Sequence, residues 1–486
     1  MDIKTQLVGS VSLANDYDYN SLGQLEKLTT PSGAEITYSY RADGRVVSIS
    51  INGVEISRST EYFPFGEPKS WEYGTGFTYQ RNYDDDGRVD DYTQGTDTQD
   101  IGYDTASRIA TLTDANNSWA FDYDNLDRLE TADKVGLSLQ WDYDATGNRL
   151  FENLNGTQTD YTTDPNSNQL DQLNSQIRQY DDAGNLTDDG AITSVYSGRN
   201  RLTSTQTGAQ TTIYQYNAFG ERVSKQSATQ TLFSYDEEGH LLGEYDASGN
   251  LTQEIIWLDD TPIVVIRPDT EPHAGLQAGN HKVFFIHPDH LDTPRTIVDA
   301  NNQVIWQWHS DPFGTQLANQ DPDTNSSDFE FNFRFPGQYF DVETGTHYNY
   351  FRDYEPETGR YVQSDPIGLD GSDNVYAYVD SDPLFYFDFN GLQKKGKFSQ
   401  SKLAYVLVGC MKIFLNVDSN LDNDTDPFNE RNSNSRGGTN TTRIENPKRP
   451  DLPPTLPEKP KKPKKWKPKK KCKPCGSKHK QYKQKG

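Results

Sequence analysis

The sequence predicts an all-β fold in which short hairpins pair into one long sheet, followed by a short, basic and mostly irregular C-terminal segment. A seven-residue motif recurs along the first half of the chain, and the composition, with 29 Tyr, 22 Phe and 37 Gly in 486 residues, suits strands and turns. Aromatic side chains favour pleated surfaces, whereas Gly, Asn and Asp favour turns. An abrupt change of charge after Leu392 predicts the separate C-terminal segment.

The motif is an aromatic residue followed by Asp or Asn, two spacers, a Gly or small residue, a polar residue and an aliphatic residue. From Tyr83 to Tyr143 it returns every 20 residues. A strand ending at the Tyr, a turn capped by the Asp and a return strand make each motif one hairpin. One such motif is an ordinary β-turn, but eleven predict an array whose open edges must curl or be capped. The motifs start at Tyr19, Tyr40, Tyr83, Tyr103, Tyr123, Tyr143, Tyr180, Tyr196, Tyr216, Tyr235 and Tyr245.

Charge divides the chain into two parts. Residues 1–392 hold 23 Lys and Arg against 64 Asp and Glu, whereas residues 393–486 hold 24 against 8. All three cysteines lie in the second part, so we expect no disulfide in the acidic part. The start MDIKTQLVGSV has no basic and apolar leader, so we expect no Sec signal peptide. The longest apolar run, residues 403–417, is shorter than the roughly 20 residues of a membrane span, which predicts no transmembrane insertion.

The motifs resemble the YD repeats of RHS proteins, and of the related teneurins and insecticidal toxin-complex subunits, over residues 15–392. Residues 287–314, HPDHLDTPRTIVDANNQVIWQWHSDPFG, and residues 333–392 resemble the RHS-associated core domain, with Asp292 where the family usually has Gly. The resemblance implies a long curled sheet or partial hollow shell around a C-terminal cargo. We therefore expect a YD-repeat array over 1–260, the core domain over 261–392 and a variable toxin or effector segment over 393–486.

Two DPxGL-type elements, DPIGL at Asp365 and DFNGL at Asp388, carry the expected chemistry. The resemblance implies that the chain cuts itself after the second element, between Leu392 and Gln393, in an aspartyl-type reaction of Asp365 and Asp388. Two nearby carboxyl groups can divide the proton transfers when their repulsion raises one pKa. We expect Arg360 as the third member, holding one carboxylate ionised or stabilising the oxyanion.

The alternative is that both elements are structural turns, since Asp-Pro and Asn-Gly are common in turns. The second element also departs from the family pattern, because Phe389 stands where Pro is usual, and Ser372 stands where a second Gly is common. Phe389 restores a backbone N–H and relaxes φ, which predicts slower or lost cleavage.

No metal and no cofactor is predicted. His287, Asp289, His290 and Asp292, with His309 nearby in sequence, contain metal-ligating side chains. The H-x-x-H spacing, however, points the two imidazoles opposite ways on a strand, so a turn followed by a strand is the better interpretation.

Residues 447–486 are rich in Lys and Pro, a composition that favours extended polyproline II and no packed core. Their lysines, with Trp466 and Tyr482, suit binding of nucleic acid, but no catalytic cluster accompanies them. Cys472 and Cys475 resemble half of a zinc motif with His479 as the one further ligand, so we expect free or redox-active thiols. A solvated basic tail is the simpler alternative.

Together these features predict an RHS-family polymorphic toxin or effector, bacterial and secreted or cell-envelope associated, that releases its C-terminal segment by self-cleavage after Leu392. The toxin activity of that segment is unidentified. Expected partners are a cognate immunity protein, secretion machinery and nucleic acid for the basic segment. The alternative is a non-enzymatic cell-surface or contact-dependent interaction protein whose basic tail binds anionic partners. A degenerate locus with a defunct tail is a third hypothesis.

Overall fold

The computed structural model describes residues 2–64, 66–115 and 117–396. All of them belong to one compact unit, Met1–Phe414, and the second unit, Leu415–Gly486, lies outside the described residues. The predictions for the apolar run 403–417, for Cys410, Cys472 and Cys475, and for the Lys/Pro-rich tail therefore fall outside them too. The described ranges contain strands and two single-turn 3-10 helices but no α-helix, so the all-β fold class is confirmed.

Eighteen strands form the first sheet, and each pairs antiparallel with the next strand along the chain. They are β1 (Asp2–Val8), β2 (Val11–Tyr19), β3 (Leu25–Thr29), β4 (Glu35–Tyr40), β5 (Val46–Ile51), β6 (Val54–Tyr62), β7 (Pro68–Tyr73), β8 (Thr78–Tyr83), β9 (Val89–Gln94), β10 (Asp97–Tyr103), β11 (Ile109–Thr113), β12 (Ser118–Tyr123), β13 (Leu129–Lys134), β14 (Leu137–Tyr143), β15 (Arg149–Leu154), β16 (Thr157–Thr163), β17 (Leu170–Leu173) and β18 (Gln176–Ile177).

The second sheet has fourteen strands in the same antiparallel succession, except that β28 pairs with β30, which also pairs with β29. They are β19 (Gln179–Tyr180), β20 (Leu186–Asp188), β21 (Ile192–Tyr196), β22 (Leu202–Thr207), β23 (Gln210–Tyr216), β24 (Arg222–Gln226), β25 (Gln230–Tyr235), β26 (Leu241–Asp246), β27 (Leu251–Leu258), β28 (Thr261–Pro268), β29 (Leu276–Ala278), β30 (His281–Pro288), β31 (Pro294–Val298) and β32 (Val304–Gln307).

Two small sheets and two 3-10 helices complete the described chain. The elements are β33 (Tyr339–Asp341), β34 (Thr346–Asn349), β35 (Arg352–Glu355), β36 (Arg360–Tyr361), η1 (Gly368–Asp370), η2 (Val379–Ser381), β37 (Tyr386–Phe387) and β38 (Lys395–Gly396). Strands β33 to β36 form one antiparallel sheet, and β37 pairs with β38.

Contacts between consecutive motifs explain the 20-residue step. The carboxylate of Asp84 accepts hydrogen bonds from the backbone N–H and from the side-chain Nε of Arg88. These two bonds close the turn. The Arg88 guanidinium lies 4.3 Å from the ring centroid of Tyr103 in the next motif, and the Tyr103 hydroxyl donates to the Val89 carbonyl at 2.8 Å. The same tyrosine contact recurs from Tyr123 to Ile109 and from Tyr143 to Leu129. Each motif is therefore fastened to the one before it.

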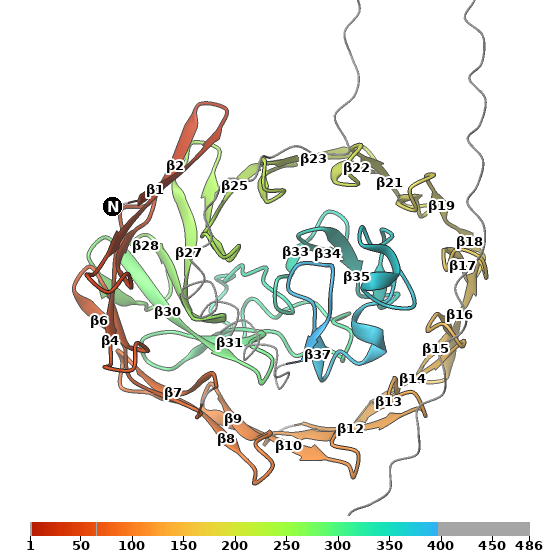
Figure 1. Ribbon diagram of the computed structural model, residues 1–486, viewed down its shortest axis with the longest axis horizontal. Helices are drawn as coiled ribbons and strands as arrows, with labels where there is room; N and C mark the ends of the chain where they lie inside the picture. Colours follow the sequence, from red (N-terminus) through yellow and green to blue (C-terminus); the bar gives the residue numbers. More distant parts are fainter. Residues whose placement is uncertain (1, 65, 116, 397–486) are drawn as a thin grey trace, which may run out of the picture. The chain divides into compact units, whose positions relative to one another are not determined.

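Within this unit the strands from β7 to β25 follow one another around a ring, β30 and β31 run into it, and β33, β34, β35 and β37 lie inside it (Figure 1). Side chains join the first strands to late ones. Asn15 donates to the Ser234 hydroxyl at 2.8 Å, and the buried carboxylate of Glu254 accepts the hydroxyls of Thr30 and Ser32, both at 2.8 Å. These contacts hold β2 and the β3–β4 turn against β25 and β27, so the array curls back on itself.

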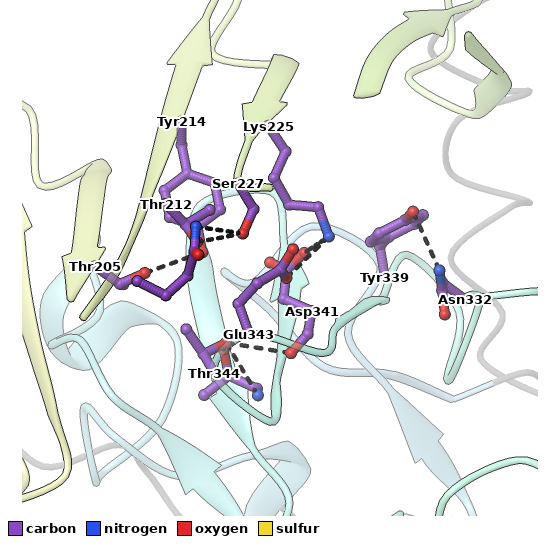
Figure 2. Close-up of polar contacts among 12 residues, drawn as sticks. Thr205, Thr212, Tyr214, Lys225, Ser227, Asn332, Tyr339, Asp341, Glu343 and Thr344 are labelled. Atoms are coloured by element: carbon purple, nitrogen blue, oxygen red, sulfur yellow. Dashed lines mark hydrogen bonds and ion pairs between the residues drawn. The ribbon is translucent and has the colours of Figure 1, made fainter. Parts of the chain in front are cut away.

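Ion pairs fasten the segment inside the ring to its wall. Lys225 of β24 lies 3.2 Å from Asp341 and 3.0 Å from Glu343, as Figure 2 shows, and Arg222 also pairs with Asp341. Arg222 and Asp341 are 1% exposed, and burial of such a pair is favourable only while both partners remain. The pairs fix the start of the small sheet that carries the residues described next.

Candidate active site

The two predicted aspartates lie at the ends of short strands of the inner segment. Asp365 follows β36 and precedes η1, whereas Asp388 directly follows β37. Their side chains are each 3% exposed. One guanidinium nitrogen of Arg352, the first residue of β35, lies 2.9 Å from Asp365 Oδ2 and 3.4 Å from Asp388 Oδ2. The fold thus brings both carboxyl groups to one buried cation.

Arg352 is itself held in place. Its Nε donates to the Gly391 carbonyl, another nitrogen donates to the Val375 carbonyl at 3.1 Å, and its guanidinium lies 3.7 Å from the ring centroid of Tyr361. The Tyr361 hydroxyl donates to Asp388 Oδ2 at 2.9 Å. Arg352 and Tyr361 therefore fix the orientation of the Asp388 carboxylate.

The second oxygen of Asp388 organises the turn that follows it, Asp388–Gln393, which we call the cleavage turn. Asp388 Oδ1 accepts four backbone N–H groups, at 2.9 to 3.3 Å, from Asn390, Gly391, Leu392 and Gln393. The Gln393 N–H is the nitrogen end of the predicted scissile bond. The carboxylate consequently lies beside the bond that the sequence singles out.

Asp365 approaches the other end of that bond. A methyl group built on Gly371 would lie 2.6 Å from Asp365 Oδ2 and 2.7 Å from the carbonyl oxygen of Leu392. Both oxygens therefore lie against the same glycine, where a side chain has no room. Gly371 therefore leaves room for the Asp365 carboxyl and for the Leu392 carbonyl oxygen, both of which an added side chain would crowd.

The environment of Asp365 favours its protonated form. Burial raises the pKa of Asp365, and the neighbouring Asp388 raises it further, although Arg352 and the Ile367 N–H act in the opposite direction. Burial and the negative charge of Asp388 also raise the pKa of Tyr361 well above its ordinary value, so this phenol remains a hydrogen-bond donor. Asp365 is therefore a carboxyl whose protonated form the surroundings favour.

Arg360 lies elsewhere. Its guanidinium donates to the Asn168 carbonyl and lies 4.9 Å from the ring centroid of Tyr376. Arg360 precedes Tyr361 on β36, and consecutive side chains of a strand point to opposite faces, so only Tyr361 faces the aspartates. The cation beside the two carboxyl groups is Arg352, which the sequence analysis did not select.

Arg352, Tyr361 and Gly371 are the site residues that sequence reasoning missed. Arg352 lies in the aromatic run YNYFRDY, and a charge in such a run needs a buried partner, which was the available signal. Nothing in the spacing distinguished Tyr361 from the many other tyrosines, or Gly371 from an ordinary turn glycine.

The cluster that begins at His287 has structural contacts. His287 is buried between the rings of Tyr73 and Tyr79, and His290 Nε2 lies 2.8 Å from the Leu384 carbonyl. Asp292 adopts φ 73°, the glycine region, and accepts from Arg81 at 2.6 Å. Within the described ranges, one group of three potential metal ligands has its ligand atoms within 4.8 Å of one another, and it consists of Asp236, Glu238 and His240.

The curled array of hairpins and the aromatic segment inside it form a β-shell of the kind seen in RHS-repeat proteins. The chain is an RHS-repeat protein related to polymorphic toxins. It is 39% identical over 114 residues to toxin protein Tse5 of Pseudomonas aeruginosa, covering 24% of this chain and 8% of that toxin. It is 31% identical over 245 residues to double-stranded DNA deaminase toxin A of Burkholderia cenocepacia, covering 44% and 17%.

Solved structures share the fold. The Tc holotoxin pore of Photorhabdus luminescens superposes with a TM-score of 0.66 at 16% identity, over 79% of this chain and 21% of that one. The TcdB2–TccC3 assembly without its hypervariable C-terminal region gives 0.66 at 17% identity, over 79% and 22%. The chain thus spans less than a quarter of each of these four proteins. No family model matches it. In the described part of the chain, no helix has the length and apolar character needed to cross a bilayer.

Proposed function

We propose that the chain cuts its own backbone between Leu392 and Gln393, with Asp365 and Asp388 as the catalytic residues. The observation that supports this proposal most strongly is that one carboxyl group lies near each end of this peptide bond. Asp365 shares the space at Gly371 with the Leu392 carbonyl, and Asp388 accepts the Gln393 N–H at 3.3 Å.

The chemistry follows from the proton positions. Protonated Asp365 donates a hydrogen bond to the Leu392 carbonyl and polarises it, while ionised Asp388 takes a proton from the attacking water. The water oxygen adds to the carbonyl carbon, the bond to the Gln393 nitrogen breaks, and the proton on Asp388 passes to that nitrogen. The products are a carboxylic acid at Leu392 and an amine at Gln393, and transfer of the acid proton to the amine leaves a carboxylate and an ammonium group. Because bond and catalysts share one chain, effective molarity is high.

The arrangement supports a division of labour along the sequence. Residues 1–260 supply the YD-repeat array, residues 261–392 supply the core domain with the cutting site, and residues 393–486 are the released effector segment. The toxin names of the relatives favour a secreted or envelope-associated bacterial protein in interbacterial competition, with an immunity protein and secretion machinery as partners. Binding of nucleic acid by the basic segment belongs to the same proposal. Growth arrest by residues 393–486 expressed in a bacterial host tests the toxin role.

Denaturing mass analysis of the expressed chain tests the cut and its position together. We expect fragments of residues 1–392 and 393–486, and an intact chain for Asp365→Asn and for Asp388→Asn. Asp370→Asn is the matched control, because Asp370 is exposed and lies outside the site, and it should cut like the natural chain. An intact natural chain, or a cut at another bond, overturns the proposal and favours a non-enzymatic interaction protein.

A further inference from the structure

One motif turn of the array touches the cleavage turn, and it carries an unusual residue. In the turns that begin at Asp84, Asp104 and Asp124, the fourth following residue is an arginine whose guanidinium lies 2.5 to 2.7 Å from the aspartate. In the turn that begins at Asp236 the same position is His240, whose Nδ1 lies 2.7 Å from Asp236 Oδ2. We infer that His240 is a positioning residue for self-cleavage, acting through Phe389. This inference rests on the proposed function.

The His240 ring is fixed on all sides. It is 2% exposed, it stacks on Trp257 with centroids 4.5 Å apart, and its Nε2 lies 3.3 Å from Asp260 Oδ1. Burial alone would lower the pKa of His240, but the hydrogen bonds with Asp236 and Asp260 outweigh burial and raise it to about 10. Glu238 lies 3.8 Å from Nδ1. The imidazole is therefore charged at neutral pH and cannot turn away from its neighbours.

The buried His240 ring also contacts Phe389. The His240 and Phe389 centroids are 5.5 Å apart and the planes are at 82°, an edge-to-face contact. Phe389 lines a pocket together with His240, Trp257 and Tyr350. The carbonyl oxygen of Phe389 lies close to Gly337. A methyl group built on Gly337 would be 1.8 Å from this oxygen.

Phe389 directly follows Asp388, so its backbone sets where the Asp388 carboxylate and the cleavage turn lie. A proline at this position would fix φ through its ring, whereas a phenylalanine leaves φ free. In this chain the packing of Phe389 against His240 supplies the missing constraint. Loss of the His240 ring would let Phe389 shift, and displacements of about 1 Å at a reacting geometry can cost about a hundredfold in rate.

Pulse labelling of the full chain during cell-free translation measures the rate of the cut. We expect His240→Ala to slow it by about tenfold, and His240→Arg to restore most of the rate, since a planar cation then pairs with Asp236 as in the other turns. Arg108→Gln is the matched control. It removes the equivalent contact to Asp104 in another motif turn and should leave the rate unchanged. In the described chain, the polar and ring contacts of the Arg108 side chain are with Asp104, Tyr123, Asp124 and Asp127.

A double-mutant cycle separates positioning from general stability. If His240 acts through Phe389, His240→Ala should have almost no further effect in a Phe389→Ala background. Independent, multiplying effects of the two substitutions would overturn the inference, as would a natural rate of cutting in His240→Ala. Either of these two results would refute the role of His240 but not the proposed function, because the natural chain would still be cut. An uncut natural chain would refute the proposed function itself.

Discussion

The backbone N–H of Gln393 donates a hydrogen bond to the Asp388 carboxylate over 3.3 Å. Asp388 lies five residues earlier in the same turn, so one local structure holds the proposed catalytic carboxylate and the bond that we propose is cut. The array of hairpins then has a single task at this place, which is to bring Asp365 and Arg352 to the preformed turn.

Gly371→Ala should block the cut while leaving the fold intact. Gly371 has φ −86°, which any residue adopts, so alanine brings no backbone strain. Its methyl group would instead crowd both groups, because it would lie 2.6 Å from Asp365 Oδ2 and 2.7 Å from the Leu392 carbonyl oxygen. Denaturing gels should show an intact chain. Gly198→Ala is the control, because nothing lies within 4 Å of its added carbon, and this variant should cut normally.

The same substitution at two buried arginines distinguishes their roles. Arg352→Lys should slow cutting by about a hundredfold or more, since lysine cannot contact both carboxylates and the Gly391 carbonyl with one planar group. Arg360→Lys should change the rate by less than about threefold, because Arg360 contacts Asn168 and not the aspartates. Pulse labelling of both variants gives the comparison. A larger effect at Arg360 would mean that Arg360 also contributes to the reaction.

The rate of cutting should fall as the pH rises. Asp365 gives a proton only in its neutral form, and burial raises its pKa, so the fall should lie above the ordinary range of aspartic acid, about pH 4. Rates between about pH 4 and pH 8.5 provide the test. A rate that increases over this interval would mean that Asp365 acts in its ionised form.

Asp353→Asn should stabilise the protein at alkaline pH. Burial raises the pKa of Asp353 from 3.8 to about 6, although the hydrogen bond with Gln363 opposes this shift. The folded state therefore binds the proton more tightly than the unfolded state, and its contribution to stability is lost as the pH rises through 6. The full difference is about 3 kcal/mol. Urea unfolding should show that the gain of the variant over the natural chain is larger at about pH 8 than at about pH 5, by about 1.4 kcal/mol.

The fold followed from local rules that the sequence repeats. The Asp cap, the turn and the return strand of each motif depend on residues within seven positions, and the tyrosine contact to the preceding motif, as from Tyr103 to Val89, depends on a constant step. Such periodic information is visible without coordinates, which is why the all-β array was predictable.

The site was predictable only where a motif carried it. Asp365 and Asp388 stand in two similar elements, and the structure brings them to one guanidinium. The choice between Arg352 and Arg360 depends on which face of a two-residue strand points inward, and the role of Gly371 depends on packing across 21 residues of chain. His240 and Phe389 are 149 positions apart, and no local pattern relates them.

Strands β37 and β38 pair across the cleavage turn, with Tyr386 opposite Gly396 and Phe387 opposite Lys395, and Lys394 adds an ion pair to Asp380 and a contact with the Tyr386 ring. The proposed hydrolysis after Leu392 would break none of these interactions. Cutting the chain and separating the two pieces would therefore be distinct events, and the new end at Gln393 would leave only after this short strand pairing has been broken.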